Sequence, residues 1–480
     1  MNKYFLLLIS IILTGILYVV FYSGLLPQSV VGEMISNTIT LSYNPVCLSE
    51  NYCRSLGHDF LQKIFLVFNA NGLIFIFAQV LLFSFSCVFL AKEFYKLTNQ
   101  KILSYLLLFS IFLNPKVFKY AFTISEEGVF IPLIAIVVAL IIKFSRKKDI
   151  NILLVLSFII GLAITIRPAA YAMVPLLLII LFVYWQFFKG IRIKTFLYLF
   201  VPLVLLVSAE SYLYYSNNSK DRETTAGVML LGKTPLIGIN KPLISKYPEL
   251  SNTIYERGKL VRKTVDSIDD FSLQQYLRNI FNPIYHDLGG LYQPIAQKIE
   301  FYKQQFGTRD TVTQGIFKEY AKENPLATIE IIGLNFVGLW QLSEILTTEQ
   351  RKVFSNWLKQ DYINDNYHKE RIKYHFSVIK KFAKFAKVAK IVMFILLLAT
   401  IYLFIRGFLN IFVALKNKKI IDAVSFSSFI FPVMLNGYFL LVAIMINVQM
   451  RFILTYWSVL MVILFLTIYL ILNKIKQNVS

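Results

Sequence analysis

The sequence contains a series of apolar runs of roughly 20 residues, the length that a helix needs to cross a lipid bilayer. The runs are residues 4–26, 71–90, 102–122, 129–144, 150–166, 169–187, 195–215, 388–412, 420–448 and 452–472. Hydrophobic residues make up 57% of the chain, which exceeds the roughly half that is typical of soluble domains. The pattern predicts an all-α polytopic membrane protein with about ten transmembrane helices.

Basic residues lie in the short segments on one side of these predicted helices. The segments contain Lys3; Lys92, Lys96 and Lys101; Lys143, Arg146, Lys147 and Lys148; Lys189, Arg192 and Lys194; Arg406, Lys416, Lys418 and Lys419; and Lys474 and Lys476. Cytoplasmic loops carry such an excess of Lys and Arg, so we expect both termini to be cytoplasmic. We predict a multi-pass protein of a bacterial plasma (inner) membrane.

The formal net charge of +22 is distributed over these loops and does not form one patch. This distribution indicates contact with anionic membrane lipids and gives no reason to expect a nucleic-acid partner.

The apolar runs divide the chain into three predicted parts. Residues 1–215 form an N-terminal transmembrane module of about seven helices, with a first outer loop at 27–70. Residues 216–387 form a mostly helical extracytoplasmic domain between helices seven and eight, and residues 388–480 form a C-terminal module of about three helices. Within the extracytoplasmic domain, the apolar run 327–342 predicts an interfacial or buried helix, because a further crossing would place the basic segment at 416–419 outside.

Two acidic residues, Glu126 and Glu127, follow the third apolar run at its outer end. A pair of carboxylates at this position could bind a metal, accept a proton or hold a sugar hydroxyl. The alternative is a solvated helix cap, because Ser125 followed by acids suits the start of the fourth helix. Both interpretations stay open from the residues alone.

Two arginines also lie at outer helix ends, Arg167 before Pro168 and Arg451 at the start of the last run. The guanidinium group is always charged and presents a planar set of donors that fits phosphate or carboxylate. The alternative is an interfacial arginine that reaches toward lipid headgroups. Two cations and two acids on one side of the membrane predict a site for an anionic, lipid-anchored substrate.

The first outer loop supplies further carboxylates, among them Glu33 and Asp59. A carboxylate here could act as the general base that takes a proton from an acceptor hydroxyl or amine. The four histidines are scattered and do not have the spacing of a zinc site. The cofactor prediction is therefore none, with a divalent metal at Glu126 left as an option. Cys47 and Cys53 share this loop, and the sequence leaves open whether they form a disulfide.

Several motifs occur in the order found in one known family. They are Gly32-Glu33 in the first loop, Phe77-Ala78-Gln79, Asn114-Pro115 through Ser125-Glu126, the run from Gly161 to Arg167-Pro168, and Arg451-Phe452. The chain thereby resembles the GT-C superfamily of integral-membrane glycosyltransferases, most of all the bacterial relatives of dolichyl-phosphate-mannose–protein mannosyltransferases and aminoarabinose transferases. The likeness covers about the first 215 residues and the last helices in outline. We identify no motif of this superfamily or of another family in the large loop.

The resemblance implies an inverting glycosyltransferase that uses a polyprenyl-phosphate-linked sugar on the extracytoplasmic face. It implies that Glu33 is the catalytic base, with Glu in place of the family's Asp, and that Arg167 and Arg451 lie near the lipid phosphate. Glu126 would hold the sugar, the acceptor or a metal, with Glu127 and Asp59 as further candidates. The acceptor would be a lipid, a glycan or a protein.

Two other functions fit the same pattern. One is a polymerase or ligase of lipid-linked surface polysaccharide, which would use an oligosaccharide donor. The other is a lipid or solute transporter, which predicts ionisable residues near the membrane midplane. We rank the transporter third because the charges in this sequence gather at the helix ends.

Overall fold

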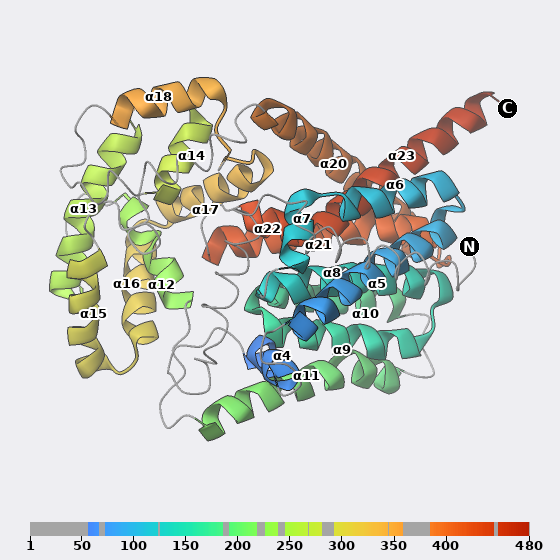
Figure 1. Ribbon diagram of the computed structural model, residues 1–480, viewed down its shortest axis with the longest axis horizontal. Coiled ribbons are helices and arrows are strands. Elements are labelled where there is room, and N and C mark those ends of the chain that lie inside the picture. Colours follow the sequence, from blue (N-terminus) through green and yellow to red (C-terminus); the bar gives the residue numbers. More distant parts are fainter. Residues whose placement is uncertain are drawn as a thin grey trace. The chain divides into compact units, whose positions relative to one another are not determined.

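The computed structural model contains only helices among the residues that it describes (Figure 1). These are residues 56–66, 73–122, 125–185, 192–217, 226–238, 245–266, 268–280, 292–343, 345–358, 385–445 and 450–479. Among these residues, six helices are long and apolar enough to cross a membrane: α5 (Leu73–Thr98), α8 (Glu126–Lys147), α11 (Arg192–Asn217), α20 (Ala386–Lys416), α21 (Ala423–Met445) and α23 (Trp457–Val479). The predicted all-α, multi-pass membrane class is confirmed at this level.

The other apolar runs give shorter helices or lie outside the described residues. The shorter apolar helices are α6 (Lys101–Phe112), α9 (Ile150–Ile166), α10 (Val174–Tyr184) with the 3-10 helix η1 (Pro168–Met173) before it, and α17 (Pro325–Trp340). The predicted helix at 4–26 lies outside the described part of the chain. The full number of crossings therefore stays a prediction.

Prolines explain two differences between the predicted and observed helices. The run 102–122 forms two helices, α6 and α7 (Pro115–Ala121), because Pro115 cannot continue a helix and prefers a first turn. The Asn114 side chain accepts hydrogen bonds from the backbone N–H groups of Lys116 (3.1 Å) and Val117 (3.3 Å) and so caps α7. The run 169–187 likewise begins within the 3-10 helix η1, whose first residue is Pro168.

The chain divides into two compact units. The first contains residues 1–222, 398–438 and 453–480, and the second contains residues 223–397 and 439–452. Helices α20, α21 and α22 (Met450–Thr455) contribute residues to both units.

In the first unit α8 is the central helix. It packs against α5 and α9, and α11 covers α9 from outside. Nearly all of α8 is buried, whereas α11 exposes apolar side chains such as Phe196, Val204 and Leu205. Exposed apolar side chains on a spanning helix are what contact with lipid requires. Cys87 of α5 is a buried free thiol.

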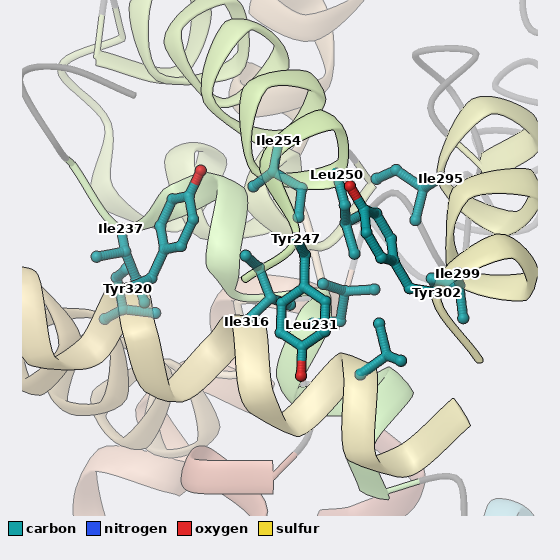
Figure 2. Packing of buried hydrophobic residues seen from close by; sticks show 12 residues of the cluster. Leu231, Ile237, Tyr247, Leu250, Ile254, Ile295, Ile299, Tyr302, Ile316 and Tyr320 are labelled. Carbon is teal, nitrogen blue, oxygen red and sulfur yellow. The ribbon is translucent and has the colours of Figure 1, made fainter. Parts of the chain in front are cut away.

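The second unit is built from shorter helices. They are α12 (Ala226–Leu231), the 3-10 helix η3 (Thr234–Leu236), α13 (Pro248–Asp266), α14 (Phe271–Ile280), α15 (Tyr292–Phe306), α16 (Arg309–Glu323), α17 and α18 (Thr348–Leu358). Aliphatic residues and tyrosines from α12, α13, α15 and α16 form its core, which includes Leu231, Leu250, Tyr302, Ile316 and Tyr320 (Figure 2). Such a core shows that this part of the chain is a folded unit and not a linker.

Helix α17 belongs to this second unit and is apolar on both its buried and its exposed faces. Ile331, Leu339 and Trp340 are buried, whereas Leu326, Ile329 and Val337 are exposed. The sequence predicts an interfacial or buried helix at 327–342. The structure has a helix there, and its buried and exposed apolar residues fit both positions.

Candidate functional site

The candidate site lies in the first unit, where α8 begins and α9 ends. There Arg167 Nη1 lies 2.9 Å from Glu127 Oε1, and only 8% and 11% of the two side chains are exposed. Glu126 precedes Glu127 in the first turn of α8 and is half-buried. A pair of charges this buried persists only when each partner compensates the other. The helix ends thus hold a fixed cation and a fixed anion together.

The local sequence fixes the position of Arg167. Arg167 is the C-cap of α9, and its backbone N–H still donates to the carbonyl of Ala163 at 2.8 Å. Its backbone is extended, with φ −147° and ψ 115°, which is the conformation that a following proline imposes. Pro168 then begins η1. The chain therefore turns away from α9 at Arg167, and the side chain is left at the junction.

The two acids are placed by the start of α8. Ser125 occupies the N-cap position with an extended backbone, although its side chain makes no capping hydrogen bond. Carboxylates in a first turn are stabilised by the positive end of the helix dipole. The two acids therefore do stabilise the start of α8, as the helix-cap interpretation predicts. Glu127 also pairs with Arg167, which a solvated cap would not require.

His58, from α4 (Leu56–Leu66), lies against the start of α8. Its imidazole donates a hydrogen bond to the backbone carbonyl of Ser125 and interacts electrostatically with Glu127. Burial lowers the pKa of His58 from 6.5 to about 4, against the opposing effect of Glu127. His58 is therefore neutral at neutral pH.

Aromatic side chains surround the guanidinium group of Arg167. Its Cζ lies 5.6 Å from the centre of the Phe130 ring. Tyr438 and Tyr456 interact electrostatically with this part of the site, and their rings stack at 3.8 Å between centres. Tyr438 Oη lies 2.8 Å from Thr455 Oγ1. The Phe130 ring and the burial of Arg167 restrict the rotation of its side chain and its access to water.

Gly128 allows α5 to approach α8 beside the two acids. A Cβ atom at this position would lie 2.0 Å from Gln79 Nε2 and 2.7 Å from the carbonyl oxygen of Tyr120. The Tyr120 contact is with backbone, which cannot simply rotate away. Only glycine fits here, and the Gln79 amide is thereby held against the backbone at Gly128, the residue after Glu127.

The charges define what the cluster can bind. Glu126 and Glu127 are acidic, Arg167 is basic and His58 is neutral at pH 7. Carboxylate oxygens accept hydrogen bonds from sugar hydroxyls and amines, and they can also hold a cation. Among the described residues no group of three or more His, Cys, Asp or Glu side chains is arranged to hold a metal ion.

The structure brings together three of the six residues that the sequence analysis named, Glu126, Glu127 and Arg167. Arg451 lies in the second unit at the start of α22, with its guanidinium carbon 5.0 Å from the centre of the Phe452 ring. Asp59 lies on α4, but its side chain is outside the described part of the structure, and so is all of Glu33.

Sequence reasoning missed the roles of His58, Tyr438 and Tyr456. His58 lacks metal-ligand spacing, and the two tyrosines lie in apolar runs where aromatic residues are common. The partners of His58 and Tyr438 lie far away along the chain, so no local pattern marks them. Comparison of the chain with protein-family models, with curated proteins and with solved structures finds no match.

Proposed function

We propose that this protein is a GT-C-like glycosyltransferase that moves a sugar from a polyprenyl-phosphate-linked donor to an acceptor outside the cytoplasm. The observation that carries the proposal is the buried Glu127–Arg167 pair next to the half-buried Glu126, at the junction of α8 and α9. This junction coincides with two of the motifs that resemble the superfamily, Ser125-Glu126 and Arg167-Pro168.

In the proposed reaction an acceptor hydroxyl or amine attacks the anomeric carbon of the donor sugar while a carboxylate takes its proton. The bond from the anomeric carbon to the phosphate oxygen breaks, and the lipid phosphate leaves with the electron pair. We assign the proton transfer to Glu33, in line with the resemblance, and the holding of sugar or acceptor hydroxyls to Glu126. The position of Glu126 in the first turn of α8, directly before Glu127 of the buried pair, supports the second assignment.

The phosphate needs more positive charge than the Glu127–Arg167 pair alone supplies. Arg167 is partly neutralised by Glu127, so it can stabilise a departing phosphate only together with another cation. We propose Arg451 for this role, as the sequence analysis predicts. The proposal includes about ten crossings, an extracytoplasmic domain that selects the acceptor, and a bacterial inner membrane location with both termini cytoplasmic.

The test is sugar transfer by membranes that contain single variants. We expect Glu126→Gln, Glu33→Gln, Arg167→Gln and Arg451→Gln each to lower the transfer rate by about 100-fold or more, as loss of a transition-state contact does. Glu330→Gln is the matched control, because Glu330 is an exposed acid of α17 in the second unit. Normal transfer by all four variants would disprove the mechanism.

The choice of donor separates this function from its nearest alternative. Monosaccharide and oligosaccharide lipid donors are supplied side by side to the same membranes. Use of the monosaccharide donor supports the proposal, whereas exclusive use of the oligosaccharide donor supports a polymerase or ligase. Movement of lipid or solute without formation of a glycosidic bond would support a transporter.

A further inference from the structure

Arg406 lies within a candidate membrane-spanning helix on a side that carries exposed apolar residues. It belongs to the first unit and to α20, where Ile401, Ile405, Leu409 and Val413 are all about half exposed or slightly more. A cation among lipid-facing side chains costs free energy unless it reaches water or an anion. The position therefore calls for a ligand or for a path to the membrane surface.

The length of α20 shows how deep Arg406 lies. The helix has 31 residues, which is roughly 46 Å at the usual rise, whereas the hydrocarbon core is roughly 30 Å thick. The segment 391–405 has no charged side chain and covers only about 22 Å. To fill the core, the spanning part must extend past Arg406 by one or two turns toward Lys416. The guanidinium group thus lies at, or just inside, the boundary between acyl chains and headgroups.

The side chains around Arg406 are mainly hydrogen-bond donors. Arg406 Nη1 donates to Tyr402 Oη at 3.0 Å, which leaves the hydroxyl proton of Tyr402 available for another acceptor. One turn further along, Asn410 Nδ2 donates to Ser425 Oγ at 2.9 Å. None of the ion pairs among the described residues involves Arg406. These side chains together have the chemistry of an anion-binding site, and the anion must come from outside the described part of the chain.

A surface cavity of about 380 Å³ lies at the same place. It is lined by Tyr402, Ile405, Arg406, Leu409 and Asn410, so that one edge is polar and the other apolar. A phosphate fits the polar edge through Arg406 and Tyr402. Acyl chains from that phosphate would run toward the membrane centre, along the exposed side chains of Ile405, Ile401 and Leu398.

We propose that α20 carries a binding site for the phosphate of an anionic phospholipid. The lipid lies in the leaflet at the basic end of the helix, where Lys416, Lys418 and Lys419 add positive potential. Charge favours this lipid over a second copy of the chain as the occupant. The chain has a net charge of +22, and the cavity lining offers a cation and hydrogen-bond donors but no acid that could pair with a basic protein surface. The site does not depend on the proposed sugar transfer.

Native mass spectrometry of the purified full-length protein tests the proposal. The protein is exchanged into micelles that contain equal amounts of dioleoyl phosphatidylglycerol and dioleoyl phosphatidylcholine. We expect the wild type to retain phosphatidylglycerol preferentially and Arg406→Gln to lose about tenfold in retention, which is the effect of one charge-assisted hydrogen bond. Tyr402→Phe should lose less, because it removes one neutral donor.

Lys147→Gln is the matched control, because it removes one exposed positive charge from the last turn of α8, a helix that does not line the cavity. It should retain phosphatidylglycerol like the wild type. Arg406→Lys, which keeps the charge, should retain an intermediate amount and guards against an Arg406→Gln variant that fails to fold. Equal retention of both lipids by the wild type, unchanged retention by Arg406→Gln, or a dimer without bound lipid would each overturn the proposal.

Discussion

At the scale of single residues, the central feature is the buried pair of Glu127 and Arg167. Removing one partner of a buried ion pair leaves an uncompensated charge, which costs about 3–5 kcal/mol. Removing both leaves no such charge. The pair should therefore behave as a unit and not as two independent contributions.

We expect Glu127→Gln and Arg167→Gln each to destabilise the protein by about 3–5 kcal/mol and the double variant to lose less than the sum. Thermal unfolding of the wild type, the two single variants and the double variant in detergent measures this coupling. The control is Glu349→Gln, because Glu349 pairs with Lys387 at 3.1 Å while both side chains are mostly exposed; it should unfold like the wild type. Additive losses in the double variant would contradict a direct pair.

His58 should make stability depend on pH. Its pKa is lowered from 6.5 to about 4 by burial, so the unfolded chain binds a proton below pH 6.5 while the folded protein does not until about pH 4. Stability is therefore complete above pH 6.5 and falls as the pH decreases toward 4. Between pH 7 and pH 5 the loss should be about 2 kcal/mol.

Unfolding temperatures of the wild type and of His58→Gln at pH 7 and pH 5 check this expectation. The variant should lose less stability over the interval, because its amide does not titrate there. An equal loss in both proteins would show that another group causes the pH dependence.

The sequence predicted some of the site residues but not their pairing. Glu126, Glu127 and Arg167 stand out because charges at the ends of apolar runs are unusual. The partner of each charge depends on how α8 packs against α9, which no periodicity within either helix encodes. Tyr438 approaches Arg167 from a helix that is more than 250 residues away along the chain.

At the scale of helices, close packing depends on a few glycines. Gly407 of α20 faces the backbone of α21: a Cβ atom at this position would lie 2.5 Å from the backbone nitrogen of Phe429 and 2.8 Å from the carbonyl carbon of Ser428. Because backbone cannot rotate away as a side chain can, any larger residue must separate the two helices. Gly437 of α21 is different, since nothing lies within 4 Å of the point that a Cβ atom would occupy there.

Gly407→Ala should therefore destabilise the protein by about 1–3 kcal/mol, the usual cost of overpacking. Gly437→Ala should be neutral or stabilising by up to about 1 kcal/mol, because alanine favours a helix more than glycine does. The measurement is the unfolding temperature of both variants in the same detergent. Equal effects at the two positions would mean that α20 and α21 do not meet closely at Gly407.

Helix positions were more predictable than helix continuity. Apolar runs of the right length mark α5, α8, α11, α20, α21 and α23, because the bilayer sets that length. Pro115 and Pro168 end or begin helices inside or beside such runs, and the effect of each proline depends on the capping contacts around it. Asn114 is the cap that makes the break before α7 favourable.

At the scale of the whole molecule, composition and charge decide the class of protein and its proposed orientation. Six candidate spanning helices among the described residues agree with a chain that is 57% hydrophobic. The second unit has its own buried core of aliphatic and tyrosine side chains, which hydropathy alone does not predict. The side of the membrane on which this unit lies follows only from the positive-inside rule.

The proposed orientation predicts which residues a membrane-impermeant maleimide can reach. Single cysteines replace Gln305, which is exposed on α15, and Asn417, which is exposed after α20, in a chain whose own three cysteines are removed. Gln305→Cys should be labelled in intact cells, and Asn417→Cys only after the cells are permeabilised. Labelling of both after permeabilisation confirms that both sites are accessible. Labelling of Asn417→Cys in intact cells would reverse the orientation and place the acceptor-selecting domain in the cytoplasm.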